Sequence, residues 1–332
     1  MVKLLYGSGA VAEGLKPSPA PFGLLDPQAM VTVQEERSPW DDVPGLDEQQ
    51  RRCLTRIYKW GVLWRKPSEG EAPVSMRYRL EHGGEVEADG NCLFTAVSVA
   101  MGGKIGAREL RRRAVGRFLE DYERDDGVGR IVVDKVIRNL YSPDLKVGWG
   151  IHVVQDVKLL AKKADRLRLD AAIRDLVDLG LEREVAAESI YKERCIPVDD
   201  GQSWAKYMSI SGSPLDEFQI ITLLYTEEGL LSVDENRDGH AATFGDDIAI
   251  ENLATEFKRQ VYVVQAHGSD AMIDEENCVF FLPHSPRGQI CEPPIFLFMK
   301  GTGWCGAGAD HYEPLVATPL PLSSQEKAAV LL

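Results

Sequence analysis

The sequence predicts an α+β fold in which a small β-sheet is flanked by helices. Two observations lead to this prediction. Early in the chain apolar residues recur at helical spacing, as in residues 110–122, where every fourth residue is apolar or aromatic. Toward the C-terminus, short β-branched and aromatic runs lie between turn residues, at 261–265, 278–282 and 295–299. Helices followed by clustered strands are typical of an α+β domain.

The composition is that of an ordinary globular protein with an acidic surface. The chain has 332 residues, 44% of them hydrophobic and 27% charged, so it can bury a sizeable core. Its 38 Lys and Arg residues against 52 Asp and Glu residues give a net charge of −14. This balance argues against nucleic-acid binding, which depends on clustered cations, and suits a partner with a basic face. No stretch approaches the roughly 18 consecutive apolar residues of a membrane span, so we expect no membrane interaction.

Cysteine usage predicts reduced thiols and no metal centre. The six cysteines show neither a C-x-x-C pair nor zinc-ligand spacing, and we expect no cofactor. Reduced thiols favour a cytoplasmic or nuclear protein. Residues 1–25 lack the apolar core of a secretory signal, and they are not rich enough in Arg and Ser to assign an organelle address. The cysteines are Cys53, Cys92, Cys195, Cys278, Cys291 and Cys305.

We divide the chain into an N-terminal arm (1–73), a central domain (74–318) and a C-terminal tail (319–332). Prolines, glycines and little periodicity indicate an extended or disordered segment at the start of the arm. A helix is predicted within the arm at 47–60, with Trp60 and Trp64 as anchors on the central domain.

The central domain is predicted to begin with a half-buried strand at 74–80, before the turn at residue 89. Five arginines lie on the helix predicted at 110–122 or just before it, and we interpret them as a solvated charged face. Those arginines are Arg108, Arg111, Arg112, Arg113 and Arg117.

A large insertion is predicted at 126–203, with residues 153–193 mostly helical. Within it, Leu179-Gly180-Leu181 suits the turn between two helices, because glycine serves as a helix C-cap. It faintly resembles the loop of a ubiquitin-associated module, but a plain helical connection is the stronger interpretation. The insertion is a lid, a substrate-positioning arm or decoration. Residues 209–243 look like another variable loop around the apolar run 218–225.

Cys92 is the first candidate for chemistry. It stands between the turn Asp89-Gly90-Asn91 and a helix predicted at 93–101. A thiol in the first turn of a helix is favoured as the nucleophilic thiolate, and the pKa of a free thiol, about 8.5, falls there. Gly90 and Asn91 allow a tight turn whose backbone N–H groups can hold an oxyanion beside the sulfur. The alternative is a small buried cysteine at a helix start.

His311 is the candidate base. A Cys-His enzyme needs an imidazole that takes the thiol proton and a polar group that orients the imidazole. His311 follows a glycine-rich loop after an apolar run, and Glu313 stands two residues later. In the same loop, Cys305 is a rival nucleophile without a helix start, and Trp304 is a candidate wall of a substrate channel. The other histidines carry no surrounding pattern.

These segments resemble the ovarian-tumour (OTU) family of papain-like cysteine proteases. Asp-Gly-Asn-Cys-Leu-Phe opening a helix, with His-Tyr and a polar residue near the C-terminus, matches the family's motifs. Residues 244–254, in which a Gly-Asp turn starts a helix before a strand, are also similar, as is the short stretch 204–208. The resemblance covers residues 76–318, with the insertion inside.

The resemblance implies an OTU-like fold and a thiol-dependent deubiquitinase that acts on ubiquitin or polyubiquitin chains, cleaving after the ubiquitin C-terminal glycine. It implies Cys92 as nucleophile, His311 as base and a place in the site for Asp89. From the sequence alone Asp89 could equally cap the Cys92 helix. The family usually has Asn or Asp where Glu313 stands, so Asp89 or Glu313 orients the imidazole. Two alternatives stay open: an inactive OTU-like protein that binds ubiquitin, and an OTU-like protease of another ubiquitin-like modifier.

Overall fold

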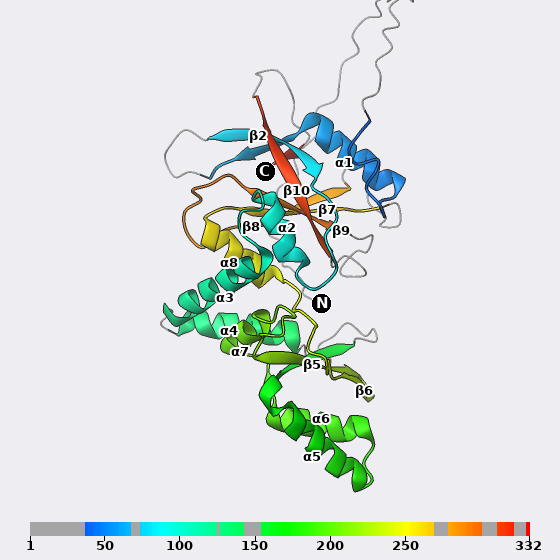
Figure 1. The fold of residues 1–332 in the computed structure, drawn as a ribbon. Coiled ribbons are helices and arrows are strands. Elements are labelled where there is room, and N and C mark those ends of the chain that lie inside the picture. The colour runs from blue at the N-terminus through cyan, green and yellow to red at the C-terminus, as the bar shows by residue number, and fades with distance from the viewer. Residues whose placement is uncertain are drawn as a thin grey trace, which may run out of the picture.

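The computed structural model describes residues 37–67, 74–124, 127–142, 154–268, 278–300, 311–321 and 330–332. In this part of the chain, helices and strands are mixed, with two β-sheets and helices packed against them (Figure 1). This architecture is compatible with the predicted α+β class. The helices are α1 Glu48–Trp60, α2 Cys92–Ala100, α3 Ala107–Arg124, α4 Val128–Tyr141, α5 Arg166–Asp178, α6 Arg183–Arg194, α7 Gly201–Met208 and α8 Asp247–Phe257.

The larger sheet has seven strands in the order β11-β1-β2-β10-β9-β7-β8, with β10 at its centre. Neighbouring strands are antiparallel except for β1 with β11 and β7 with β9. Strands β7, β8 and β9 confirm the three strands predicted near the C-terminus. The bounds are β1 Val62–Arg65, β2 Ser75–His82, β7 Val261–Ala266, β8 Val279–His284, β9 Ile295–Lys300, β10 His311–Leu320 and β11 Val330–Leu331.

Helices cover both faces of this sheet because its inner strands are apolar on both faces. On β9, Phe296 and Phe298 join a buried cluster with α1 and with Trp40. The alternate residues Ile295 and Leu297 face a second cluster formed by α2, α3 and α8. The side-chain period of a strand is two, so one strand supplies both cores. The central strands are therefore buried between α1 and the α2–α3–α8 layer.

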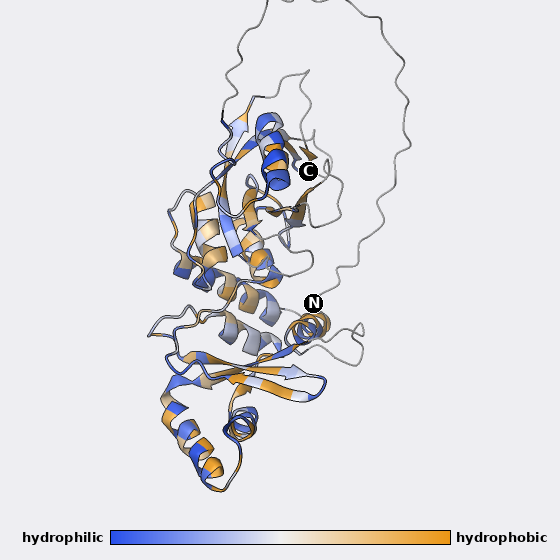
Figure 2. Cartoon of the chain, turned by 90° about the vertical axis from the view of Figure 1, so that its right-hand side faces the viewer, coloured by the Kyte–Doolittle hydropathy of each residue, from blue (hydrophilic) through white to orange (hydrophobic). Residues whose placement is uncertain are grey.

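The smaller sheet has the strand order β4-β3-β5-β6, and all its pairs are antiparallel. Helices α5 and α6 cover one face, and α5 alternates between hydrophilic and hydrophobic residues as an amphipathic helix does (Figure 2). On the other face Leu160 and Ile220 belong to the same core cluster as Cys92, so the two sheets share that core. The bounds are β3 Gln155–Lys162, β4 Ile196–Pro197, β5 Phe218–Thr226 and β6 Gly229–Asp234.

The insertion differs from its prediction in one respect. Helices α5 and α6 confirm its helical part, but residues 155–162 form β3 rather than a helix. Leu159 faces α5 and α6 while Leu160 faces the other core, so both faces of this strand are buried. A strand buried on both faces loses the apolar–polar alternation by which sequence patterns are recognised. The predicted loop at 209–243 likewise contains β5 and β6.

The two ends of the chain contribute more than an arm and a tail. Residues 1–36 and 68–73 lie outside the described part, but α1 confirms the predicted helix and β1 pairs with β2. Trp64 is buried as predicted, whereas Trp60 is 52% exposed and is not an anchor. Within the predicted tail, β11 pairs with β1.

One cysteine pair contradicts the expectation of reduced thiols. Cys53 on α1 and Cys278 beside β8 form a disulfide across 225 residues of sequence. Such a separation gives no spacing signal, so the pair could not be recognised from the sequence. Among the described residues, Cys92, Cys195 and Cys291 are thiols rather than halves of a disulfide. None of the described helices is long and apolar enough to cross a membrane.

Candidate active site

The turn that precedes Cys92 is held by its own polar groups. Gly90 has a φ of +84°, the left-handed region that favours glycine. An Asp89 carboxylate oxygen accepts a hydrogen bond of 2.8 Å from the backbone N–H of Asn91. Asn91 is the N-cap of α2, and its side chain makes no capping bond. Asp89 therefore builds the turn rather than capping the helix. It also engages one of the N–H groups predicted to hold an oxyanion.

The side chain of Arg111 holds this turn in place. Because Arg111 is buried, α3 is not the uniformly solvated basic face that we predicted. Its side chain is 1% exposed, and its guanidinium lies 4.3 Å from the ring centroid of Phe94. Burial lowers the pKa of Arg111 to about 10, although nearby anionic groups oppose this. The guanidinium donates to Gly90 O at 3.0 Å, Asn91 Oδ1 at 2.8 Å, Met208 O at 2.8 Å and Thr243 O at 2.7 Å.

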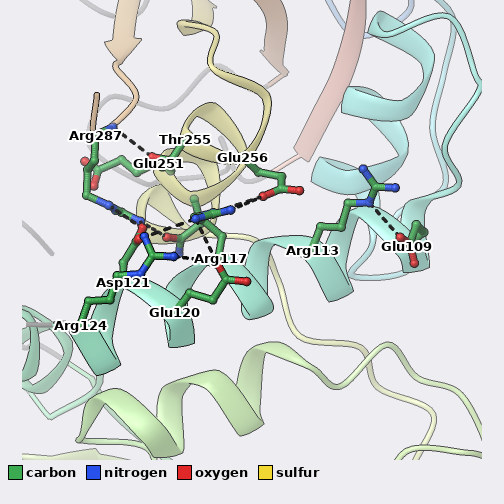
Figure 3. A network of polar contacts seen from close by, with 11 residues as sticks. Glu109, Arg113, Arg117, Glu120, Asp121, Arg124, Glu251, Thr255, Glu256 and Arg287 are labelled. Atoms are coloured by element: carbon green, nitrogen blue, oxygen red, sulfur yellow. Dashed lines mark hydrogen bonds and ion pairs between the residues drawn. The ribbon is translucent and has the colours of Figure 1, made fainter. Parts of the chain in front are cut away.

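The other α3 arginines are closer to the prediction. Arg112 and Arg113 pair with Glu109 on the helix surface. Arg117 reaches across to Glu256 on α8 at 3.1 Å, and the neighbouring Asp121 of α3 binds Arg287 at 2.8 Å (Figure 3). These ion pairs link α3 to α8 and to the loop at residue 287. Only Arg111 turns inward, toward the Cys92 loop.

Residues 242–246 pack against the same loop. A Cβ atom on Gly90 would lie 2.7 Å from the backbone oxygen of Ala242, so the two backbones touch. A Cβ atom on Gly245 would overlap the Leu93 side chain, the residue after Cys92. The predicted Gly-Asp turn is thus packed directly against the start of α2.

Asp246 connects this segment to residues 204–208. Its carboxylate caps α8 through the Ala249 N–H at 2.9 Å, and it accepts hydrogen bonds from Trp204 Nε1 at 3.1 Å and Tyr141 Oη at 2.8 Å. Burial raises the pKa of Asp246, and these three hydrogen bonds oppose that rise. The helix predicted to follow the Gly-Asp turn is confirmed as α8.

Strand β10 brings the histidine motif to α2. His311 is the first residue of β10, and α2 packs against this strand. Tyr312, the next residue, lies in the same buried cluster as Cys92. Burial raises the pKa of Tyr312, and the charges of Asp247, Asp246 and Cys92 raise it further. Tyr312 therefore faces the core that contains Cys92, whereas His311, one residue earlier, is directed to the other face at the beginning of the strand.

Glu313 is buried on the opposite side of β10 from Tyr312. Its side chain is 1% exposed, and its two oxygens have different partners. Oε2 lies 2.7 Å from His82 Nε2, and Oε1 accepts from Lys300 Nζ at 3.0 Å. His311 Nε2 lies 3.9 Å from the same Oε1, which is an electrostatic contact rather than a hydrogen bond. Burial raises the pKa of Glu313, but the hydrogen bonds and charges of His82 and Lys300 outweigh it and lower the pKa overall.

The predicted site residues therefore fall into two groups. Asp89, Gly90, Asn91 and Cys92 form one loop, and His311 with Glu313 forms the start of the central strand packed on that loop's helix. Among the hydrogen bonds and ion pairs of the described residues, none joins Asp89 to His311, whereas Glu313 is next to it. Residues 301–310, with Trp304 and Cys305, lie outside the described part.

Three residues of the site were missed from the sequence. Arg111 resembles its exposed neighbours in α3, so nothing local marks it as buried. His82 ends a strand 231 residues from Glu313, and Lys300 ends the strand before β10, 13 residues from Glu313; no local pattern connects either of them to it. Strand pairing alone brings them together: Lys300 is opposite His311, and His82 is opposite Leu315.

In the described part of the chain, no group of three or more His, Cys, Asp or Glu side chains is arranged to hold a metal ion. Neither a protein-family model nor a curated protein matches this sequence.

Proposed function

We propose that the protein is a thiol-dependent ubiquitin hydrolase that uses Cys92 as nucleophile and His311 as base. One observation carries the proposal. The helix that begins at Cys92 packs on the strand that begins at His311, and Cys92 and Tyr312 share one buried cluster. Cys-His hydrolysis requires an imidazole within reach of a thiol at a helix N-terminus, so the ring of His311, which shares the Glu313 face of β10, must turn around the end of the strand to meet the sulfur.

The first half of the reaction forms a thioester. The thiol proton of Cys92 passes to His311, and the thiolate sulfur attacks the carbonyl carbon of the ubiquitin C-terminal glycine. The resulting oxyanion develops near the first turn of α2, where N–H groups and the positive end of the helix dipole stabilise it. The C–N bond then breaks, and the His311 imidazolium donates its proton to the leaving lysine amine.

The second half regenerates the thiol. His311 removes a proton from water, and the hydroxide attacks the thioester carbon. Ubiquitin leaves with a free carboxylate, and the proton held by His311 returns to the Cys92 sulfur. Glu313, beside His311 Nε2, stabilises the imidazolium in both halves, which leaves Nδ1 for the exchange with sulfur. Asp89 acts on the turn instead, through its bond to Asn91.

A second candidate function is supported by the burial of the thiol. Cys92 is 1% exposed, so a substrate reaches its sulfur only after neighbouring side chains move. A ubiquitin-binding protein without hydrolase activity would not need that movement. A hydrolase specific for another ubiquitin-like modifier would need it and would use the same residues.

Cleavage of a panel of di-ubiquitins separates these functions. The proposal predicts cleavage by the full chain, loss of cleavage in Cys92→Ala, and unchanged cleavage in Cys291→Ala, which removes an exposed free thiol. Binding of di-ubiquitin without cleavage would support the inactive binder. Cleavage only of fusions to another modifier would support the third possibility.

A further inference from the structure

We propose that His82 is a positioning residue for the reaction: its Nε2 holds one oxygen of Glu313 so that the other oxygen faces His311. The inference rests on the proposed function, because a positioned imidazole matters only if His311 is the base. It concerns a residue for which the sequence offers no role.

Strand register places the participating side chains on one face of the sheet. His311 and Glu313 are two residues apart on β10 and so point the same way. Lys300 on β9 is directly opposite His311, and His82 on β2 is directly opposite Leu315. Cross-strand partners share a face, so His82, Lys300, Glu313 and His311 converge on one end of the central strand.

The two oxygens of Glu313 are used differently. His82 Nε2 lies 2.7 Å from Oε2, whereas Lys300 and His311 both lie beside the other oxygen, Oε1. Oε1 lies between Lys300 Nζ at 3.0 Å and His311 Nε2 at 3.9 Å. Lys300 balances the charge of the carboxylate, whereas His82 fixes its rotation. Without His82, the carboxylate can turn about its last bond and move Oε1 away from His311.

His82 is itself held by its surroundings. Its side chain is 9% exposed, and its ring centroid lies 6.0 Å from that of Trp40. Trp40 is fully buried and packs edge-on against Phe298, with ring centroids 5.5 Å apart. A side chain confined in this way can hold a partner at a fixed position, as groups behind a catalytic residue must.

Two substitutions at position 82 distinguish positioning from a purely structural role. The amide nitrogen of Gln occupies the place of histidine Nε2, whereas that of Asn is too short to reach Glu313. We expect His82→Asn to lower kcat for ubiquitin-substrate cleavage about 10- to 100-fold, because a misplacement of about 1 Å can cost about 100-fold, with little change in KM. His82→Gln should restore kcat to within about threefold of the original, since it keeps the hydrogen bond. His240→Asn, at an exposed histidine, is the matched control and should change neither constant.

A double-substitution cycle tests whether His82 acts through Glu313. In a Glu313→Gln background, His82→Asn should cause little further loss of kcat, because the two residues act as a unit. Independent, multiplying losses would overturn the proposal, as would equal kcat for the Asn and Gln variants. Unfolding midpoints identify any variant that fails to fold, and His82→Gln alone then remains as the test: loss of kcat in a folded Gln variant contradicts the proposal.

A readout without ubiquitin separates this inference from the proposed function. The rate at which iodoacetamide alkylates Cys92, followed by mass spectrometry of its peptide, reports thiolate formation assisted by His311. We expect the rate to fall in His82→Asn and to recover in His82→Gln. Equal rates in both would overturn the role of His82. If the alkylation rate falls in His82→Asn and recovers in His82→Gln, but the protein cleaves no ubiquitin substrate, only the proposed function is overturned.

Discussion

The guanidinium of Arg111 donates a hydrogen bond of 3.0 Å to the carbonyl oxygen of Gly90, two residues before Cys92. A buried cation on α3 thus holds the backbone turn from which the candidate nucleophile projects. The same side chain bonds the carbonyl oxygens of Met208 and Thr243, so it ties three separate segments together.

Replacing Arg111 should affect both folding and turnover. Arg111→Met keeps an unbranched apolar stem but leaves the oxygens of Gly90, Met208 and Thr243 without the guanidinium donor. We expect the free energy of unfolding to fall by about 3 kcal/mol or more, since each unsatisfied buried group costs about 1–3 kcal/mol. Arg112→Met, on the same helix at an exposed arginine that pairs with Glu109, is the control and should change it by no more than about 0.5 kcal/mol. Equal effects in chemical denaturation would contradict this account of Arg111.

Gly90→Ala should be destabilising for two independent reasons. The residue has a φ of +84°, and an added Cβ would lie 2.7 Å from the backbone oxygen of Ala242. We expect a loss of about 1–3 kcal/mol in the free energy of unfolding, together with lower turnover because the turn before Cys92 must shift. Gly116→Ala, inside α3 with open space around it, should instead stabilise by about 0.5–1 kcal/mol. Thermal unfolding of both variants shows directly whether each substitution lowers or raises the stability.

The pKa of Glu313 predicts a pH-dependent contribution to stability. The folded pKa lies below the unfolded value, so Glu313 contributes stability above its unfolded pKa of about 4.3 and loses it as the pH falls through the folded pKa. The difference in unfolding free energy between the original chain and Glu313→Gln should therefore be largest near neutral pH and should shrink below about pH 4. Glu228→Gln, on an exposed turn, should show no such trend. A pH-independent difference for Glu313→Gln would contradict the ion-pair assignment.

The disulfide between Cys53 and Cys278 should contribute measurably to stability. It joins α1 to the edge of the larger sheet across 225 residues. Cys53→Ser should lower the free energy of unfolding by about 2–4 kcal/mol, the typical contribution of a disulfide. Peptide mapping without reductant should find the two cysteines cross-linked, with Cys291 free to react. Recovery of Cys53 as a free thiol in the folded protein would contradict the pairing.

The local elements of the fold could be predicted where one face of an element meets water. The alternation of residues 74–80 and the four-residue repeat of residues 110–122 correspond to β2 and α3. Strand β3 could not be recognised because apolar neighbours such as Leu159 and Leu160 face different cores. Its burial depends on α5 and α6 covering one face and the main core covering the other, which only the assembled fold reveals.

The candidate site, too, could be predicted from the sequence only in part. The turn and helix start at Cys92 depend on neighbouring residues, so the sequence could predict them. Arg111 differs from Arg113 only in the direction it faces on α3, and a run of three consecutive arginines does not indicate which of them is buried. The contact of His82 with Glu313 spans 231 residues and depends on the register between β2 and β10. Sequence patterns report local periodicity, and none of these contacts is local.

The central claim is tested most directly by a ubiquitin whose C-terminus carries a thiol-reactive group. The protein should form a covalent adduct with this probe, and mass spectrometry should place the adduct on Cys92. His311→Ala should lower the labelling rate by several orders of magnitude while the unfolding midpoint stays near that of the original chain, because the thiol loses its base. An adduct on another cysteine, or labelling of Cys92 that is unchanged in His311→Ala, would contradict the account.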